Sequence, residues 1–73
     1  MTITLYWKSD GTLQKAKPDV VKQFPVFSEQ DIWDKLIDIG FWQIENLPAG
    51  RGIVVHDDET LATFSGEKFC ILI

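Results

Sequence analysis

Residues 28–39, with the sequence SEQDIWDKLIDI, carry the pattern that decides the fold of this chain. Ser28 is a preferred N-cap residue, and Asp31 follows three residues later in the position of a capping box. Phe27 and Ile32 have the spacing of a hydrophobic staple. We therefore expect an amphipathic α-helix over about residues 28–39.

The predicted helix has an apolar face and an acidic face. At 100° per residue, one arc collects the apolar side chains of Ile32, Trp33, Leu36, Ile37 and Ile39. The opposite side collects Asp31, Asp34 and Asp38, a stripe that Glu29 extends. Gly40 supplies a C-terminal stop. We expect the apolar face to pack on a sheet and the acids to face water.

The segments before the helix have strand and turn patterns. Residues 2–7 alternate between apolar and polar side chains, which predicts a half-buried strand. Residues 9–12, SDGT, are a turn signal, so residues 13–17 are expected to return as an edge strand or an extended arm. Residues 18–24 begin at one proline and precede another, a pattern compatible with a single helical turn.

After the helix the pattern changes to strands. Residues 41–45 are expected to form one strand, followed by a loop. The β-branched run at residues 53–56 is expected near the centre of the sheet, and residues 60–64 and 68–73 complete a meander. We favour a place inside the sheet for residues 68–73. The alternative is an edge position, where this strand would pair with another chain.

These patterns predict one α+β domain over residues 1–73. Its fold is an antiparallel sheet of about 4–6 strands with one amphipathic helix (about residues 28–39) packed on one face, in the order hairpin, helix, meander. A chain of 73 residues with 45% hydrophobic and 12% aromatic content suits a single small globular unit.

The cysteine and histidine content restricts the chemistry. Cys70 is the single cysteine, which excludes an internal disulfide, and with one histidine it excludes the common structural zinc sites. A small extracellular domain more often carries several cysteines, so a cytoplasmic location is expected. No segment has the apolar length of a membrane span.

Charge is distributed unevenly along the chain. The net charge of −4 divides into +2 over residues 1–24 and −6 over residues 25–73. The lysines of the first part are too few for the basic stripe that nucleic-acid binders carry; they are Lys8, Lys15, Lys17 and Lys22. An acidic surface instead favours a basic surface on a partner.

Three clusters have residue types that can carry chemistry. The run HDDE at residues 56–59 resembles a metal-ligand cluster, but a solvated hairpin turn is the expected role. Cys70 and His56 could form a nucleophile–base pair, although apolar neighbours favour a neutral thiol. Gly50, Arg51 and Gly52 suit a tight connection and lack a phosphate-loop pattern. We therefore predict no catalytic residues, no cofactor and no metal.

These observations predict a non-enzymatic protein-interaction module. It would be a small acidic inhibitor, of the kind that phages and mobile elements encode, or an adaptor that occludes a basic site on a partner. The predicted partner-binding residues are Glu29, Asp31, Asp34, Asp38 and Trp42. The alternative is a structural or assembly subunit that forms homodimers or larger homo-oligomers through its C-terminal strand. An enzyme centred on His56 ranks third, and direct binding of nucleic acid ranks fourth.

Overall fold

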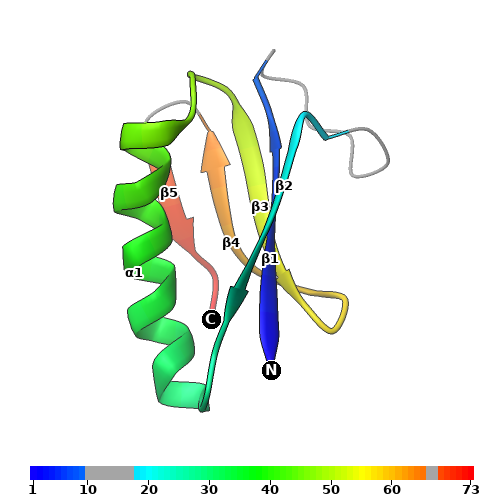
Figure 1. Ribbon diagram of the computed structural model, residues 1–73, viewed down its shortest axis with the longest axis vertical. Helices are drawn as coiled ribbons and strands as arrows, with labels where there is room; N and C mark the ends of the chain where they lie inside the picture. Colours follow the sequence, from blue (N-terminus) through cyan, green and yellow to red (C-terminus); the bar gives the residue numbers. More distant parts are fainter. Residues whose placement is uncertain (10–17, 66–67) are drawn as a thin grey trace.

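A computed structural model describes residues 1–9, 18–65 and 68–73, and within them five strands and one helix form a two-layer structure. The elements are β1 (Thr2–Lys8), β2 (Val20–Pro25), α1 (Glu29–Asn46), β3 (Arg51–His56), β4 (Glu59–Ser65) and β5 (Lys68–Ile71). Neighbouring strands pair antiparallel in the order β2-β1-β3-β4-β5. Figure 1 shows α1 running alongside the sheet, next to β5. The predicted α+β class, with the order hairpin, helix, meander, is confirmed.

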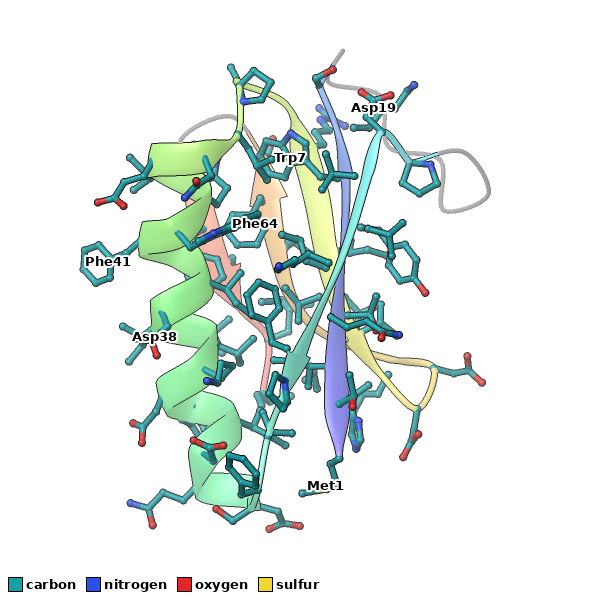
Figure 2. All side chains as sticks on the ribbon, viewed as in Figure 1. Met1, Trp7, Asp19, Asp38, Phe41 and Phe64 are labelled. Carbon is teal, nitrogen blue, oxygen red and sulfur yellow. The ribbon has the colours of Figure 1, made fainter. Side chains whose placement is uncertain are left out.

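The core is built on the alternation of β1. Ile3, Leu5 and Trp7 are fully buried, and they pack with Leu36 of α1 and Phe64 of β4 in one cluster. The rings of Trp7 and Phe64 meet edge to face, with centroids 5.8 Å apart, between the sheet and α1 (Figure 2). Full burial of an Ile, Leu or Phe side chain contributes about 1.5–3 kcal/mol, so this cluster is what holds α1 on the sheet.

The start of α1 confirms the predicted N-cap. The Ser28 hydroxyl accepts a hydrogen bond from the Asp31 N–H at 3.2 Å, and the Asp31 carboxylate accepts one from the Phe27 N–H at 2.9 Å. The predicted hydrophobic staple is wrong, because Phe27 is 87% exposed. Val26, which is 1% exposed, is the residue that enters the core before the helix.

The predicted end of the helix is wrong. α1 continues through Gly40 to Asn46, so the strand expected at residues 41–45 is helical. Gly40 is buried against β5: a Cβ atom added there would lie 2.9 Å from Cδ2 of Phe69. The glycine therefore serves close packing of α1 on the sheet rather than helix termination.

Pro48 is the signal that ends α1. Leu47 adopts an extended conformation (φ −122°, ψ 144°), which is the conformation that a following proline favours. The Leu47 N–H still donates to the Gln43 carbonyl at 3.0 Å, and the Asn46 side-chain amide donates to the Trp42 carbonyl at 2.8 Å. The Leu47 bond uses one of the last four carbonyl oxygens of α1, which have no donor within the helix.

The helical turn considered for residues 18–24 is wrong, because this segment forms β2. β2 pairs antiparallel with β1, in a register that sets Trp7 opposite Val20 and Thr2 opposite Pro25. Pro18 precedes the strand and Pro25 closes it, so neither proline interrupts the ladder. The return strand predicted at residues 13–17 and most of the turn at residues 9–12 lie outside the described residues.

The meander of β3, β4 and β5 is confirmed, with β3 at the sheet centre as predicted. Close approach of β3 to β1 requires glycine: a Cβ added at Gly52 would lie 2.6 Å from Cε3 of Trp7, and one added at Gly50 would collide with the Lys8 carbonyl oxygen. The favoured place of the C-terminal strand inside the sheet is wrong, because β5 forms an edge.

Asp19 ties the end of β1 to the start of β2. Its carboxylate accepts hydrogen bonds from the Ser9 hydroxyl at 2.6 Å and the Ser9 N–H at 2.8 Å, and pairs with the Lys8 ammonium at 2.9 Å. The two Ser9 bonds, followed by Lys8, hold the pKa of Asp19 well below its ordinary value of 3.8.

A lowered pKa in the folded state predicts how Asp19 contributes to stability across pH. The contribution is complete above the unfolded-state pKa near 3.8 and is lost as the pH falls below that value. We expect Asp19→Asn to lower the free energy of unfolding at about pH 6 and to differ progressively less from the wild type towards about pH 2. Urea unfolding across this range measures the difference. Asp34→Asn, which removes an exposed carboxylate of α1, is the control and should not lower the free energy of unfolding at about pH 6. A difference between Asp19→Asn and the wild type that did not change with pH would contradict the assignment.

Candidate functional site

α1 exposes a line of large apolar side chains that we call the apolar stripe: Trp33, Ile37, Phe41 and Ile44. They are 45%, 49%, 68% and 71% exposed, respectively. The sequence pattern had assigned Trp33 and Ile37 to the buried face, and that assignment is wrong. The other three members of the predicted apolar face, Ile32, Leu36 and Ile39, are buried as expected.

Helix geometry explains why the apolar stripe stays outside the core. The buried line of α1 continues from Leu36 through Ile39 and Gly40 to Gln43. At 100° per residue, the apolar stripe lies about a quarter-turn or more around the helix from the centre of that line. The sheet covers the first arc, and the side chains of the second arc remain exposed. Exposed apolar side chains gathered in one patch are typical of a binding surface.

A groove runs between the apolar stripe and the edge strand β5. Its volume is about 310 Å³. Its lining residues are Ile37, Gly40, Phe41, Gln43 and Ile44 of α1, with Phe69 and Ile71 of β5. Phe69 forms part of the floor, because its ring stacks on Phe64 with centroids 4.5 Å apart and an interplanar angle of 7°. We call this feature the α1–β5 groove.

The apolar stripe is bordered by exposed carboxylates that we call the acid row: Asp34, Asp38 and Glu45. Phe41 connects the two features, because Asp38 lies three residues before it and Glu45 four residues after it on the helix surface. Figure 2 shows both Asp38 and Phe41 directed away from the sheet. Apolar and acidic groups are therefore available together to one approaching molecule.

The five residues predicted to bind a partner do not form one surface. Asp34 and Asp38 belong to the acid row, whereas Glu29 lines a second hollow together with Trp33 and His56. Asp31 is half-buried and its carboxylate caps the start of α1. Trp42 is half-buried too, packed edge to face on Phe24 with centroids 5.8 Å apart.

The sequence pattern missed three residues of this surface: Phe41, Ile44 and Glu45. All three lie in residues 41–45, where the sequence pattern predicts a strand and not the helical spacing that relates them to Ile37 and Asp38. The signal that could have found them is the 3.6-residue period, which continues beyond Gly40 as far as Pro48.

The acids in the middle and at the end of α1 work against the stability of the helix. The helix carries five acids and one lysine, and no basic residue lies in its last turn, where the helix dipole favours a cation. Asp34 and Asp38 are four residues apart, a like-charge spacing that costs a few tenths of a kcal/mol. Glu45 lies near the negative end of the dipole. Local rules broken without a compensating contact are typical of residues kept for binding.

The turn between β3 and β4 has the geometry of a tight hairpin. His56 and Glu59 are opposite each other, and both residues between them have positive φ, 48° at Asp57 and 66° at Asp58, as a type I′ turn requires. His56 Nδ1 lies 3.2 Å from the Thr2 carbonyl oxygen, and Nε2 lies 3.3 Å from the Asp57 carboxylate. In the described parts of the chain, no three His, Cys, Asp or Glu side chains converge as metal ligands do.

The possible pair of Cys70 and His56 is not brought together. Cys70 is exposed and lies opposite Thr63, and its neighbours in β5, Phe69 and Ile71, point to the helix side of the sheet. Side chains alternate along a strand, so the thiol lies on the uncovered face. His56 lines a hollow on the helix side with residues of α1.

Comparison of the chain with family models, with curated proteins and with solved structures yielded no match. Among the described residues, no helix combines the length and the apolar character that crossing a membrane requires.

The positive φ at Asp58 gives a prediction for the hairpin turn. Glycine adopts this conformation without the cost that a Cβ atom brings, so we expect Asp58→Gly to raise the free energy of unfolding by about 0.5–1 kcal/mol. Asp58→Ala removes the same carboxylate and keeps a Cβ atom, so it should give no such gain. Thermal unfolding of the two variants compares them directly. Equal stability of both would show that the turn does not impose the backbone conformation described.

Proposed function

We propose that this protein is a non-enzymatic interaction module that binds a partner protein through the exposed side of α1. The observation that carries the proposal is the apolar stripe beside the acid row. The partner would offer an apolar surface bordered by lysine or arginine, and binding would occlude a basic site on it. An inhibitor or an adaptor of the kind that phages and mobile elements encode fits this mode of action.

The apolar stripe would supply most of the binding energy. Interface energy concentrates in a few large side chains that become fully desolvated, and aromatic residues are prominent among them. Phe41 and Trp33 are the aromatic members of the stripe, and Phe41 is the more exposed. Ile37 and Ile44 flank Phe41 on the helix and would exclude water around it.

The acid row would supply orientation and speed of association. Complementary charges steer the encounter and reject partners of like charge, even where they add little to final affinity. The negative charge of α1 accounts for the net charge of the whole chain, since the helix alone sums to −4. The free, exposed thiol of Cys70 suits a reducing compartment, so the cytoplasm is the proposed site of action.

The proposal predicts that two groups of substitutions weaken binding in different ways. With a partner captured from lysate of the source cell and then purified, Phe41→Gln should weaken the affinity about 30-fold or more at any salt concentration. The combined change Asp34→Asn, Asp38→Asn and Glu45→Gln should slow association, with an effect that disappears near 1 M salt, where screening is nearly complete. Surface plasmon resonance at several salt concentrations separates the two.

Matched controls come from elsewhere on the same chain. Val21→Gln removes an exposed apolar side chain of β2, 54% exposed, and the pair Asp57→Asn and Asp58→Asn removes exposed carboxylates from the hairpin turn. Neither control should change affinity or association rate. If the affinity of Phe41→Gln for the partner equals that of the wild type or that of Val21→Gln, the α1 surface is not the binding site.

The edge position of β5 favours a second candidate, a structural subunit that self-associates. β5 pairs with β4 on one side and offers its other side to a further strand. The natural form of such an assembly is a symmetric dimer in which two copies of β5 lie antiparallel.

Self-association predicts a mass that depends on concentration. Light scattering coupled to size exclusion should then show the mass rising from the 8.4 kDa of one chain towards twice that value between micromolar and millimolar protein. Ile71→Lys should abolish the rise, and Val21→Lys, on the opposite edge strand, should not. A constant monomer mass over the whole range would exclude this candidate.

A further inference from the structure

The two edges of the sheet are protected to different degrees. β2, at one edge, carries exposed Lys22 and ends at Pro25, and both features discourage pairing with another chain. β5, at the other edge, has no proline, and Lys68 at its first position is its one charged residue. Natural proteins usually block an edge that must stay unpaired. The contrast marks β5 as the edge that is kept open for pairing.

The backbone of β5 is oriented to receive a strand. The Leu72 N–H donates to the Leu61 carbonyl at 2.8 Å, so the backbone at this position points towards β4. Because peptide groups alternate along a strand, the N–H and C=O groups of Phe69 and Ile71 point away from β4, towards solvent. The thiol of Cys70 lies 4.0 Å from the Ile71 carbonyl oxygen, a weak contact that an incoming N–H would replace.

The α1–β5 groove is placed to receive the side chains of such a strand. Strands in a sheet lie about 4.8 Å apart, so an added strand would lie one step beyond β5. Its side chains on the helix side would then enter the groove and meet Ile37, Phe41 and Ile44, which are exposed. Side chains on the other side would join the uncovered face, beside Cys70.

The charges around the α1–β5 groove indicate which charged residues the bound segment carries. Asp34, Asp38 and Glu45 border the groove along α1 and are exposed to solvent. A segment with lysine or arginine next to its apolar positions would place cations near these carboxylates, and an acidic segment would be repelled. The occupant is thus an extended segment with apolar residues at alternate positions and basic residues flanking them.

A second copy of the chain fits this site less well than a foreign segment. The helix-side residues of β5, Phe69 and Ile71, already line the groove of their own molecule, so they are not available to fill that of a neighbour. Self-pairing would also bring together two chains of net charge −4, each with its acid row near the contact.

We propose that β5 and the α1–β5 groove together bind a basic, extended segment of a partner protein as an additional strand of the sheet. The main-chain hydrogen bonds would run to Phe69 and Ile71, and alternate apolar side chains would occupy the groove, which is the mode called β-strand addition. This inference rests on the proposed function, since it names how the partner binds to the same surface.

The test has two steps, a selection of peptides that bind the chain and a methylation scan of the backbone of one of them. The full chain is used to select binders from a library of random twelve-residue peptides, and the enriched peptides should have apolar residues two apart with lysine or arginine beside them. One such peptide is then methylated at each backbone nitrogen in turn, and binding is followed by fluorescence anisotropy. Methylation should weaken affinity about tenfold at every second position and less than about twofold between them, because every second N–H faces β5.

Amide hydrogen exchange places the peptide on the protein. The amides of Phe69 and Ile71 should exchange quickly in the free chain and become protected when the peptide binds. Phe41→Gln should lower the affinity for the peptide at least about tenfold, and Val21→Gln should leave that affinity unchanged. If both amides were already protected without peptide, and this protection increased with protein concentration, a second copy of the chain would occupy this edge. That result would overturn the proposal.

The experiment separates this inference from the proposed function. A different result would keep α1 as the binding surface and overturn strand addition. The enriched peptides would then have apolar residues three and four apart, methylation would weaken binding without alternating along the peptide, and Phe41→Gln would abolish binding. A selection that enriched no peptide, or peptides indifferent to Phe41→Gln, would overturn strand addition at the groove, whereas the proposed function is contradicted only by a captured partner that binds Phe41→Gln as tightly as the wild type.

Discussion

Close contact between Gly40 and Phe69 sets the position of α1 on the sheet, and the exposed features of the protein follow from it. With no Cβ atom at residue 40, the helix backbone approaches the edge strand β5 directly, and the ring of Phe69 fills the space between them on top of Phe64. The helix is anchored on its other flank by Trp42 against Phe24 of β2. These two contacts fix both the height of α1 above the sheet and its rotation about its own axis.

Rotation about the helix axis decides which apolar residues are core and which are surface. The buried line through Leu36, Ile39 and Gln43 faces the strands, and the remaining apolar side chains are carried past β5. A helix rotated by one residue step would bury Ile37 and Ile44 and expose Leu36. Gly40 prevents that rotation, because the line containing it is the line that can approach Phe69.

The sequence predicted those parts of the fold that depend on local chemistry. The alternation of Ile3, Leu5 and Trp7 located β1, and Ser28 located the start of α1, since an N-cap and a pleat are recognisable from neighbouring residues alone. The end of α1 was predicted incorrectly because a glycine can serve either as a helix stop or as a packing surface. The difference depends on Phe69, which lies 29 residues further along the chain.

The candidate site was less predictable because it depends on sheet order and on helix rotation. A β-branched or aromatic run such as residues 69–71 is compatible with a central or an edge strand, and the sequence does not show which neighbour it has. The helical period identified Trp33 and Ile37 as apolar but could not show that the sheet ends before reaching them. Two of the four predicted partner-binding acids lie outside the acid row, since Asp31 caps the start of the helix and Glu29 lines a hollow that His56 also lines.

The features of the α1–β5 side are unlike those of the rest of the surface in one further respect. Several exposed groups elsewhere have an identifiable structural role: Asp19 joins two strands, Asp57 and Asp58 form the turn that reverses the chain, and Lys22 and Pro25 protect an edge strand. On the α1–β5 side the exposed groups cost stability, through repelling carboxylates on a helix, aromatic surface in water and an edge strand left open. Three different physical effects thus lower the stability of the protein on one side of a 73-residue chain. One partner strand bound along that side would reduce all three.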